Sequence, residues 1–311
     1  MANTLTHLVV PGQIIAEGDD FLRGHGTYVE SKKQKDGGGE RLVASVAGRI
    51  ERVNKLVSVI PVSSSVYRGH VGDLVIGRIT SVQNTRWRVL LGENAGKLAQ
   101  LPLSGVHLPG GVQRMRTQQD SREMRKLFQE GDLVCAEVHN VGNNTNDNSI
   151  SLHTRSLVRY GKLENGCLIV VPPSLVPRRK NHFVVMAKNT ISLVLGNNGY
   201  IWIQRALPHD QEEGQGDDNS NEANKSTLLL AEHQEKIHRE HKETPVLPDE
   251  RYRIARIRNS IECLSKVHLL VSPENITTVY EESIKIFPDD TTISGMLHPQ
   301  NILILTRPMM K

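Results

Sequence analysis

Two glycine–aspartate turns, each followed by an apolar run suited to a β-strand, constrain the fold more than any other feature of this sequence. The pairs at 72–73 and 131–132 precede the runs 74–82 and 133–141, and a short alternating stretch at 149–153 follows. Two further strands fit between the turns. The five predicted strands are 74–82, 86–91, 96–101, 133–141 and 149–153. This order is typical of a five-stranded OB barrel, one face of which commonly holds single-stranded nucleic acid.

The 311 residues are enough for two or three domains, and the barrel accounts for residues 65–157. Between its third and fourth strands we expect a Gly-rich loop at 108–115 and a short helix at 120–129. Before the barrel, residues 1–64 predict a small β domain. Its clearest strands are 42–50 and 56–62, which flank a turn at Asn54-Lys55.

After the barrel, residues 158–311 mix strands with helices. Strands are expected at 166–171, 191–195 and 200–203, and helices at 227–242, 249–267 and 272–287. The tail at 301–309 is expected to be extended. Residues 207–227 are acidic and rich in Gly, Asn and Ser, which predicts a disordered or mobile insertion. The fold class is therefore multidomain and mainly β, with a smaller α/β part and C-terminal helices.

Composition favours RNA handling over membrane, zinc or cofactor functions. The net charge of +4 and the pI of about 8.9 are compatible with an RNA partner, and with only 4% aromatic residues contacts to phosphate are expected to outweigh base stacking. Cys135, Cys167 and Cys263 lie far apart and without zinc-site spacing, which suits a reducing compartment. No apolar run approaches membrane-spanning length, and the N-terminus lacks signal-peptide features. We expect no metal, no cofactor and no membrane partner.

Basic residues on the predicted barrel strands and loops form the candidate RNA-binding set. Its members are Arg78, Arg86, Arg88, Lys97, Arg114, Arg116, His153 and Arg155. The alternative is that these cations form an ordinary solvated face, and that Trp87 among them belongs to the core. A second basic group, at 178–180, lies in a predicted loop and is open to the same two interpretations, phosphate steering or solubilising charge.

The segment Gly196-Asn197-Asn198-Gly199 has the GxxG form of the RNA-clamping loop of KH domains. That loop joins two helices, whereas the flanks here, 193–195 and 200–203, have the pattern of strands. Asn and Gly tolerate positive φ angles, so a tight hairpin turn or a close contact between domains is the favoured interpretation.

An enzyme would need a site, and the sequence offers two weak candidates. The carboxylates between Asp210 and Glu222 could be imagined as the metal ligands of a two-metal nuclease centre. The residues around them predict a flexible loop, which cannot hold metal ligands in a fixed geometry. His238 and His241 have helical spacing but no third ligand and no glutamate in a metalloprotease frame. No nucleotide-binding or nucleophile motif occurs. We expect no catalytic residues.

The order of domains, together with several segments, resembles the cap subunits of the RNA exosome. The matching segments are 10–12, 23–29, 72–79, 108–111, 129–133, 151–156, 160–163 and 195–203. The Leu-Pro-Gly-Gly loop at 108–111 and the Ser-Leu-His-Thr-Arg-Ser strand at 151–156 are most similar to the ribosomal-RNA-processing protein four type. The resemblance covers about residues 8–205. It implies a barrel of the ribosomal protein S-one type and a KH-like domain at 158–311.

The resemblance also implies a function and partners. In this family three non-catalytic cap proteins bridge a ring of RNase PH-like subunits, and single-stranded RNA passes through the cap toward a nuclease for 3′–5′ processing, including ribosomal RNA maturation. A place in the nucleus, nucleolus and cytoplasm is expected. The N-terminal domain would dock on the ring, and the motif at 196–199 would pack at the junction of the barrel and the KH-like domain. The ring-docking candidates are Pro11, Gly12, Gly24, His25 and Gly26. An autonomous RNA-binding regulator and a metal-dependent ribonuclease remain the alternatives.

Overall fold

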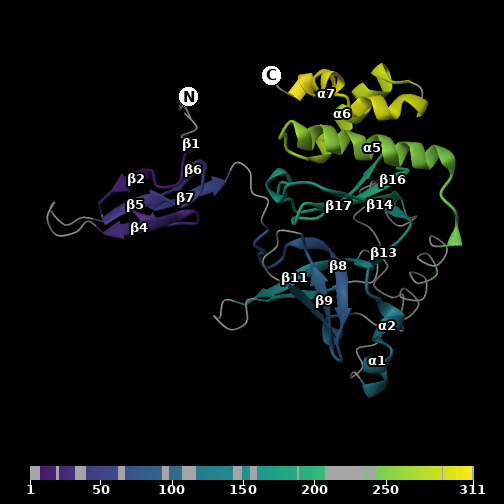
Figure 1. The fold of residues 1–311 in the computed structure, drawn as a ribbon, viewed down its shortest axis with the longest axis horizontal. Coiled ribbons are helices and arrows are strands. Elements are labelled where there is room, and N and C mark those ends of the chain that lie inside the picture. The colour runs from purple at the N-terminus through teal and green to yellow at the C-terminus, as the bar shows by residue number, and fades with distance from the viewer. Residues whose placement is uncertain are drawn as a thin grey trace, which may run out of the picture. The chain divides into compact units, whose positions relative to one another are not determined.

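The computed structural model divides the chain into two compact units, Met1–Ser65 and Val66–Lys311 (Figure 1). The structure describes residues 8–18, 21–31, 40–61, 67–92, 98–106, 117–142, 149–154, 160–187, 189–206, 236, 243–288 and 290–309. The predicted fold class is confirmed: small β sheets come first, then a closed five-stranded barrel, then an α/β part with C-terminal helices. The predicted insertion at 207–227 and most of the helix predicted at 227–242 lie outside the described residues.

The N-terminal unit consists of two small sheets whose strands pair mostly antiparallel. Its strands are β1 (Leu8–Val9), β2 (Ile14–Glu17), β3 (Leu22–Arg23), β4 (Thr27–Ser31), β5 (Glu40–Ala44), β6 (Gly48–Val53) and β7 (Leu56–Pro61). One sheet has the order β1-β6-β7-β3 and the other β2-β5-β4. Val9, Ala44 and Val59 form the buried core of the unit.

The single strand predicted at 42–50 is wrong. The chain leaves one sheet at the end of β5 and enters the other at the start of β6. Between them the backbone N–H of Ser45 donates to the carbonyl oxygen of Gly26 at 2.9 Å. The apolar run continues through this crossing because Ala44 is buried and Val46 packs against the same core. The predicted turn at Asn54 is present, with a φ of 56°.

The barrel is formed by five strands, and a sixth is added at one edge. They are β8 (Leu74–Val82), β9 (Arg86–Leu90), β10 (Ala99–Pro102), β11 (Leu133–Val141), β12 (Ile150–His153) and β13 (Gly161–Leu163). The sheet order is β12-β10-β9-β8-β11-β13, and a further pairing of β12 with β11 closes the barrel. Inward side chains such as Trp87, Val89, Leu101 and Leu152 are fully buried. Alternation along each strand therefore sends the intervening side chains outward.

Short helical segments connect the third and fourth barrel strands. They are η2 (Leu103–Gly105), α1 (Gln118–Arg122) and α2 (Met124–Leu127). One helix was predicted at 120–129, but the structure has two, which meet at Glu123. The first begins with a capping box, in which Thr117 and Asp120 each accept a backbone N–H from the other. The Gly-rich loop predicted at 108–115 lies outside the described residues.

The α/β part is a four-stranded antiparallel sheet covered by helices on one face (Figure 1). Its elements are β14 (Gly166–Val170), η3 (Pro173–Leu175), β15 (Phe183–Met186), β16 (Ile191–Leu195), β17 (Tyr200–Arg205), α5 (Pro248–Lys266), α6 (Pro273–Ile286), η4 (Asp290–Leu297), α7 (Pro299–Thr306) and η5 (Arg307–Met309). Ile257, Ile261 and Leu264 of α5 pack on the sheet. Figure 1 shows α6 and α7 on the far side of α5 from the sheet.

The C-terminal tail is helical, so the extended segment predicted at 301–309 is wrong. Ile302 and Leu305 are buried and lie one helical turn apart, which is the spacing of an amphipathic helix packed on a core. No helix in the described part of the chain is long and apolar enough to cross a membrane.

A buried arginine ties the two long helices together and supplies a test of this packing. Arg256 on α5 is 4% exposed, and its Nη1 donates to the carbonyl oxygens of Ser283 and Phe287 at 3.0 and 2.9 Å. A cation at this place also complements the negative end of α6.

We expect Arg256→Met to lower the free energy of unfolding by about 2–3 kcal/mol, because two buried carbonyl oxygens lose their donor. Arg253→Met is the matched control, because Arg253 lies on the same helix but is exposed; its cost should stay within about 0.5 kcal/mol. Denaturant unfolding followed by tryptophan fluorescence measures both, since both tryptophans lie in the larger unit. Equal losses in the two variants would contradict this assignment.

Candidate nucleic-acid interface

A row of polar side chains runs across all five strands on the outer face of the barrel. Register pairs Ser81 with Arg88, Arg88 with Gln100, Gln100 with Ser151, and Ser151 with Asn140. Paired residues lie on the same face of a sheet, so these five form one continuous row. Their strand neighbours Trp87 and Val89 are buried, as the alternation requires. The row contains one cation and no carboxylate.

Among the described residues, no carboxylate forms an ion pair with the arginines of this face. The Arg86 guanidinium donates from Nη1 to Oε1 of Gln100 at 2.6 Å, and Arg78 donates to the carbonyl oxygen of Gly131 at 3.0 Å. Arg88 is exposed, and its guanidinium has no ion pair among the described residues. Uncompensated guanidinium groups are the groups that bind phosphate best.

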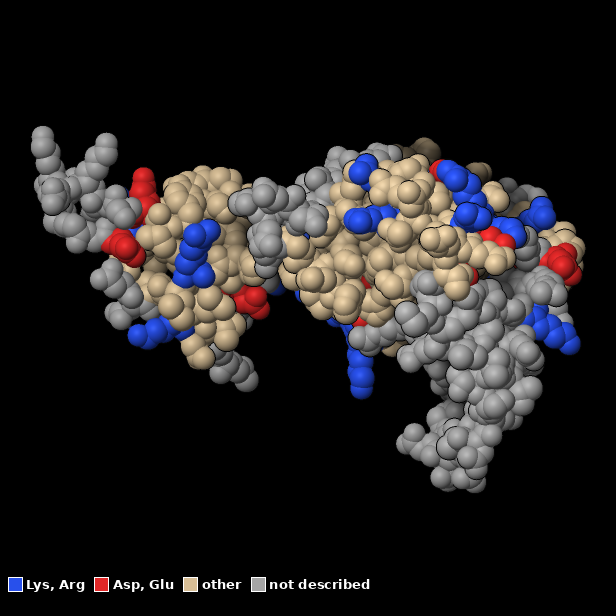
Figure 2. Space-filling view, turned by 90° about the horizontal axis from the view of Figure 1, so that it is seen from below, with Lys and Arg blue, Asp and Glu red and all other residues tan. Residues whose placement is uncertain are grey.

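Several other cations of the same unit are paired with carboxylates. Arg125 lies 3.0 Å from Glu130, Arg205 lies 3.9 Å from Glu250, and Lys162 contacts both Asp132 and Glu164 at 3.1 Å. Figure 2 shows Lys and Arg side chains gathered over one end of the larger unit, with a few acidic side chains among them. The barrel arginines differ from these three cations in having no acidic partner among the described residues.

The structure describes only half of the predicted RNA-binding set. Arg78, Arg86 and Arg88 are exposed, and His153 is half-buried with its ring 5.2 Å from that of His139 in an edge-to-face contact. Arg78, Arg86 and Arg88 come from the adjacent strands β8 and β9, whereas His153 comes from β12, which pairs with β10 and β11 instead. Lys97, Arg114, Arg116 and Arg155 lie outside the described residues.

Trp87 belongs to the barrel core, so the core interpretation of this residue is confirmed. Its side chain is fully buried, and Nε1 donates to the carbonyl oxygen of Phe128 at 3.1 Å. The Phe128 ring meets the indole edge-on at 5.3 Å. No base can stack on a ring in this position.

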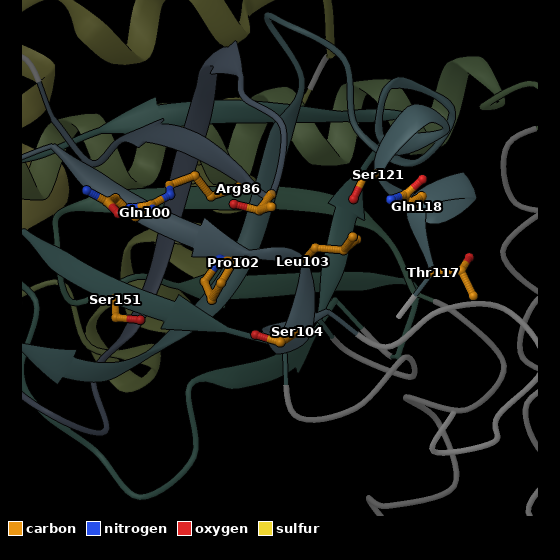
Figure 3. A pocket seen from close by; sticks show the side chains of 10 residues that line it. Arg86, Gln100, Pro102, Leu103, Ser104, Thr117, Gln118, Ser121 and Ser151 are labelled. Atoms are coloured by element: carbon orange, nitrogen blue, oxygen red, sulfur yellow. Dashed lines mark hydrogen bonds between the residues drawn. The ribbon is translucent and has the colours of Figure 1, made fainter. Parts of the chain in front are cut away.

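A hollow of about 570 Å³ lies beside the polar row and shares Gln100 and Ser151 with it. Figure 3 shows Arg86 and Gln100 on one side of it, Gln118 and Ser121 of α1 on the other, and Pro102 and its neighbours between them. Sequence reasoning missed Gln100 and Ser151 because they are uncharged. Their alternation with buried Leu101 and Leu152 would have placed them on the outer face.

The motif at 196–199 lies between the barrel and the sheet of the α/β part. Asn198 is 3% exposed and bonds to the barrel backbone three times. Its Nδ2 donates to the carbonyl oxygens of Ile76 and Leu91 at 2.7 and 2.6 Å, and its Oδ1 accepts the Ile76 N–H at 3.2 Å. Gly199 has a φ of +83°, and a side chain there would collide with the Val171 carbonyl oxygen. The motif therefore joins β16 to β17 and is closed to RNA.

A buried carboxylate completes this junction. Asp73 is 4% exposed and accepts hydrogen bonds from the Tyr67 hydroxyl at 2.8 Å and from Asn197 Nδ2 at 3.2 Å. Burial raises the pKa of Tyr67 far above its usual value, and the Asp73 charge raises it further, so the phenol stays a donor. Arg178 lies 3.3 Å from the same carboxylate.

The basic group at 178–180 is largely neutralised, which disfavours phosphate steering. Arg178 pairs with Asp73, and both nitrogens of the Arg179 fork donate to Glu274 at 2.7 Å. The Arg179 hydrogen bonds hold the pKa of the Glu274 carboxyl at about 2. Only Lys180 of the three is exposed and has no ion pair among the described residues.

The ring-docking candidates differ in their surroundings. Pro11, Gly12 and His25 are exposed. Gly24 and Gly26 are half-buried, and a side chain at either would collide with the backbone of β7. The two inner glycines therefore allow close packing of the sheets.

Groups suited to hold a metal ion are absent from the part of the chain that the structure describes: no three His, Cys, Asp or Glu side chains gather there. The acidic run between Asp210 and Glu222, and the pair His238 and His241, lie outside the described residues. All three cysteines are free, and burial raises the pKa of Cys263 to about 11. A thiol with a raised pKa is a poor nucleophile.

Comparison with known protein families gives three matches that together cover just over half of the chain. The model described as "Exosome complex exonuclease RRP4 N-terminal region" matches residues 8–53, "RRP4, S1 domain" matches residues 66–140, and "KH domain" matches residues 166–209.

Individual relatives extend the match beyond these segments. The Exosome complex component rrp4 of Schizosaccharomyces pombe is 40% identical over 278 residues, covering 89% of this chain and 76% of that protein. The Exosome complex component RRP4 of Mus musculus is 41% identical over 278 residues, covering 89% and 82%. The Exosome complex component Rrp4 of Pyrococcus horikoshii is 31% identical over 202 residues, covering 63% and 68%.

Proposed function

This chain belongs to the RRP4 family of exosome complex components, and from this premise we propose that it is a non-catalytic, RNA-binding cap subunit of an RNA exosome. As a cap subunit it docks on the RNase PH-like ring subunits through its N-terminal domain and assembles with the other cap subunits. It guides single-stranded RNA toward the nuclease for 3′–5′ processing and decay, including ribosomal RNA maturation. We place it in the nucleus, the nucleolus and the cytoplasm, where such maturation and decay occur.

The observation that carries the RNA-binding part of this proposal is the polar row on the barrel. The row contains Arg88, and Arg86 lies two residues away on the same strand; neither forms an ion pair with a carboxylate among the described residues. Guanidinium groups in this setting attract the phosphates of a single strand without reading its sequence. Since Trp87 is in the core, stacking on an aromatic platform does not contribute at this place. Binding is therefore weak, salt-sensitive and largely independent of sequence.

We propose that the chain is non-catalytic because of the side-chain types on this outer face of the barrel. The described row offers hydroxyls, amides and guanidinium groups, which can hold RNA but do not supply a general base or a metal ligand set. One matching family model has the word exonuclease in its name, but it matches only residues 8–53. In this chain that region consists of two small β sheets. The chain therefore delivers RNA and leaves cleavage to another subunit.

The barrel arginines supply the experiment. We expect the double variant Arg86→Ala/Arg88→Ala to weaken binding of a single-stranded RNA about tenfold at low salt. Each lost phosphate contact also removes about 0.7 from the slope of log affinity against log salt, so the slope should become shallower by about 1.4. Fluorescence anisotropy of a labelled oligonucleotide titrated at several salt concentrations measures both quantities, and gel analysis of the same samples should show uncleaved RNA.

Arg125→Ala is the matched control, because Arg125 is also an exposed arginine of this unit but is paired with Glu130. Its slope should change by less than about 0.3. An unchanged slope in the double variant, or an affinity that does not depend on salt, would contradict electrostatic capture on this face. RNA cleavage that disappears on deletion of residues 207–227 would contradict the non-catalytic assignment.

A further inference from the structure

We propose that the hollow beside Arg86 is a binding pocket for one ribonucleotide whose base is turned out of the strand. This inference rests on the proposed function, because it assigns one nucleotide of the bound RNA to a defined place. The pocket would add selection for RNA over DNA to an otherwise sequence-independent face. The shape of the hollow, its uncommitted polar groups and its continuity with the polar row support this assignment.

The shape is that of a small-ligand site with two walls and a floor. The ends of β9 and β10 form one wall with Arg86 and Gln100, and α1 forms the other with Gln118 and Ser121 (Figure 3). Pro102 lies on the floor and offers an apolar surface to a flat ring. The volume of about 570 Å³ falls in the usual range for small-molecule sites.

The polar groups around this hollow are uncommitted and mostly neutral. The Gln118 amide and the hydroxyls of Thr85, Ser104, Ser121 and Ser151 have no hydrogen-bond partner among the described residues. Hydroxyls and amides can each donate and accept, as the edge of a base and the hydroxyls of a ribose require. A pocket for phosphate alone would contain more cations, and a pocket for an amine would contain carboxylates, which this lining lacks.

A single cation at the mouth fits a single phosphate. Arg86 donates one of its five N–H groups to Gln100, and the other four have no acceptor among the described residues. The Gln100 side chain accepts this bond through Oε1, and its amide group also carries two N–H donors on Nε2. The Arg86–Gln100 pair therefore presents several N–H donors to a ligand, and the hydrogen bond between the two side chains orients them before RNA binds.

The pocket is continuous with the row that binds the strand. Gln100 and Ser151 belong to both, and Arg86 lies two residues from Arg88 on the same strand. A strand held by its phosphates along the row therefore passes the mouth of the pocket. Turning one base into the pocket brings its ribose against the serine hydroxyls, where a 2′-hydroxyl gains hydrogen bonds that deoxyribose cannot make.

The experiment compares RNA with DNA on the full chain. The variant Gln118→Ala/Ser121→Ala removes the α1 wall groups and keeps Thr117 and Asp120, which cap the helix. We expect it to raise the dissociation constant for a single-stranded RNA about five- to tenfold, and that for DNA of the same sequence less than about twofold. Gln119→Ala is the matched control, since Gln119 lies on α1 and does not line the pocket. It should change neither constant.

A second probe keeps the proposal testable if the double variant is poorly folded. RNA containing 4-thiouridine, cross-linked to the unmodified protein, should label peptides that contain Pro102–Ser104 or Gln118. Cross-links confined to other segments would overturn the pocket. Equal binding of RNA by the variant and the unmodified chain would overturn it too, and the proposed function would still stand if Arg86→Ala/Arg88→Ala weakens binding. Failure of the unmodified chain to bind any RNA would overturn both.

Discussion

Asn198→Ala is expected to lower the free energy of unfolding of the larger unit by about 4 kcal/mol, because three buried backbone groups lose their partner at once. The carbonyl oxygens of Ile76 and Leu91 and the N–H of Ile76 all bond to this one side chain. A buried polar group left unsatisfied costs about 1–3 kcal/mol. Denaturant unfolding followed by tryptophan fluorescence reports on this unit, which contains Trp87 and Trp202.

Two further variants distinguish the loss of the junction's hydrogen bonds from the effect of removing side-chain volume. Asn198→Asp keeps the size but places a carboxylate against the Ile76 and Leu91 carbonyl oxygens, so its loss should equal or exceed that of Asn198→Ala. Asn181→Ala removes one exposed contact, a bond from the Phe183 N–H at 3.0 Å, and should cost less than about 1 kcal/mol. A loss for Asn198→Ala as small as that for Asn181→Ala would contradict the role of this junction.

Trp87→Ala is expected to lower the free energy of unfolding by about 5 kcal/mol, the larger of the two effects. Replacing a fully buried tryptophan with alanine leaves a cavity that costs about 3–5 kcal/mol, and the Phe128 carbonyl oxygen also loses its donor. Trp202 remains as the fluorescence reporter for the denaturant titration.

The adjacent residue gives the contrasting result. Arg88→Ala should leave the free energy of unfolding within about 0.5 kcal/mol, because Arg88 is exposed. Trp87→Phe should show an intermediate loss of about 2 kcal/mol, since it keeps an aromatic ring beside Phe128 but removes the hydrogen bond. Similar losses at positions 87 and 88 would mean that the alternation of inward and outward residues on β9 is wrong.

The sequence predicted the barrel and the long helices well, because both show strong local periodicity. The helices predicted at 249–267 and 272–287 are α5 and α6, each of which begins at a proline, Pro248 and Pro273. The N-terminal crossing between β5 and β6 was missed because its apolar residues continue while the chain changes sheets. The tail helix α7 was missed because four apolar residues, 302–305, show no alternation, and only packing on the core decides their conformation.

The functional face was only partly predictable. The outward orientation of Arg86 and Arg88 follows from the alternation of exposed and buried residues on β9, in which Trp87 between them is buried. Gln100 and Ser151 join them through a parallel pairing of β10 with β12, which brings together residues about fifty positions apart and leaves no local pattern. The pairing of Arg178 with Asp73, 105 positions away in sequence, is equally long-range, so no local feature could show that this loop cation is neutralised.

Native affinity purification of this chain, followed by mass spectrometry of the bound proteins, tests the central claim most directly. The extract is treated with ribonuclease first, so that RNA cannot bridge unrelated proteins. A cap subunit should recover RNase PH-like ring subunits and two further OB-containing proteins in nearly equal amounts. Recovery of the chain alone, or of RNA-binding partners without a ring, would contradict the cap role and favour an autonomous RNA-binding regulator.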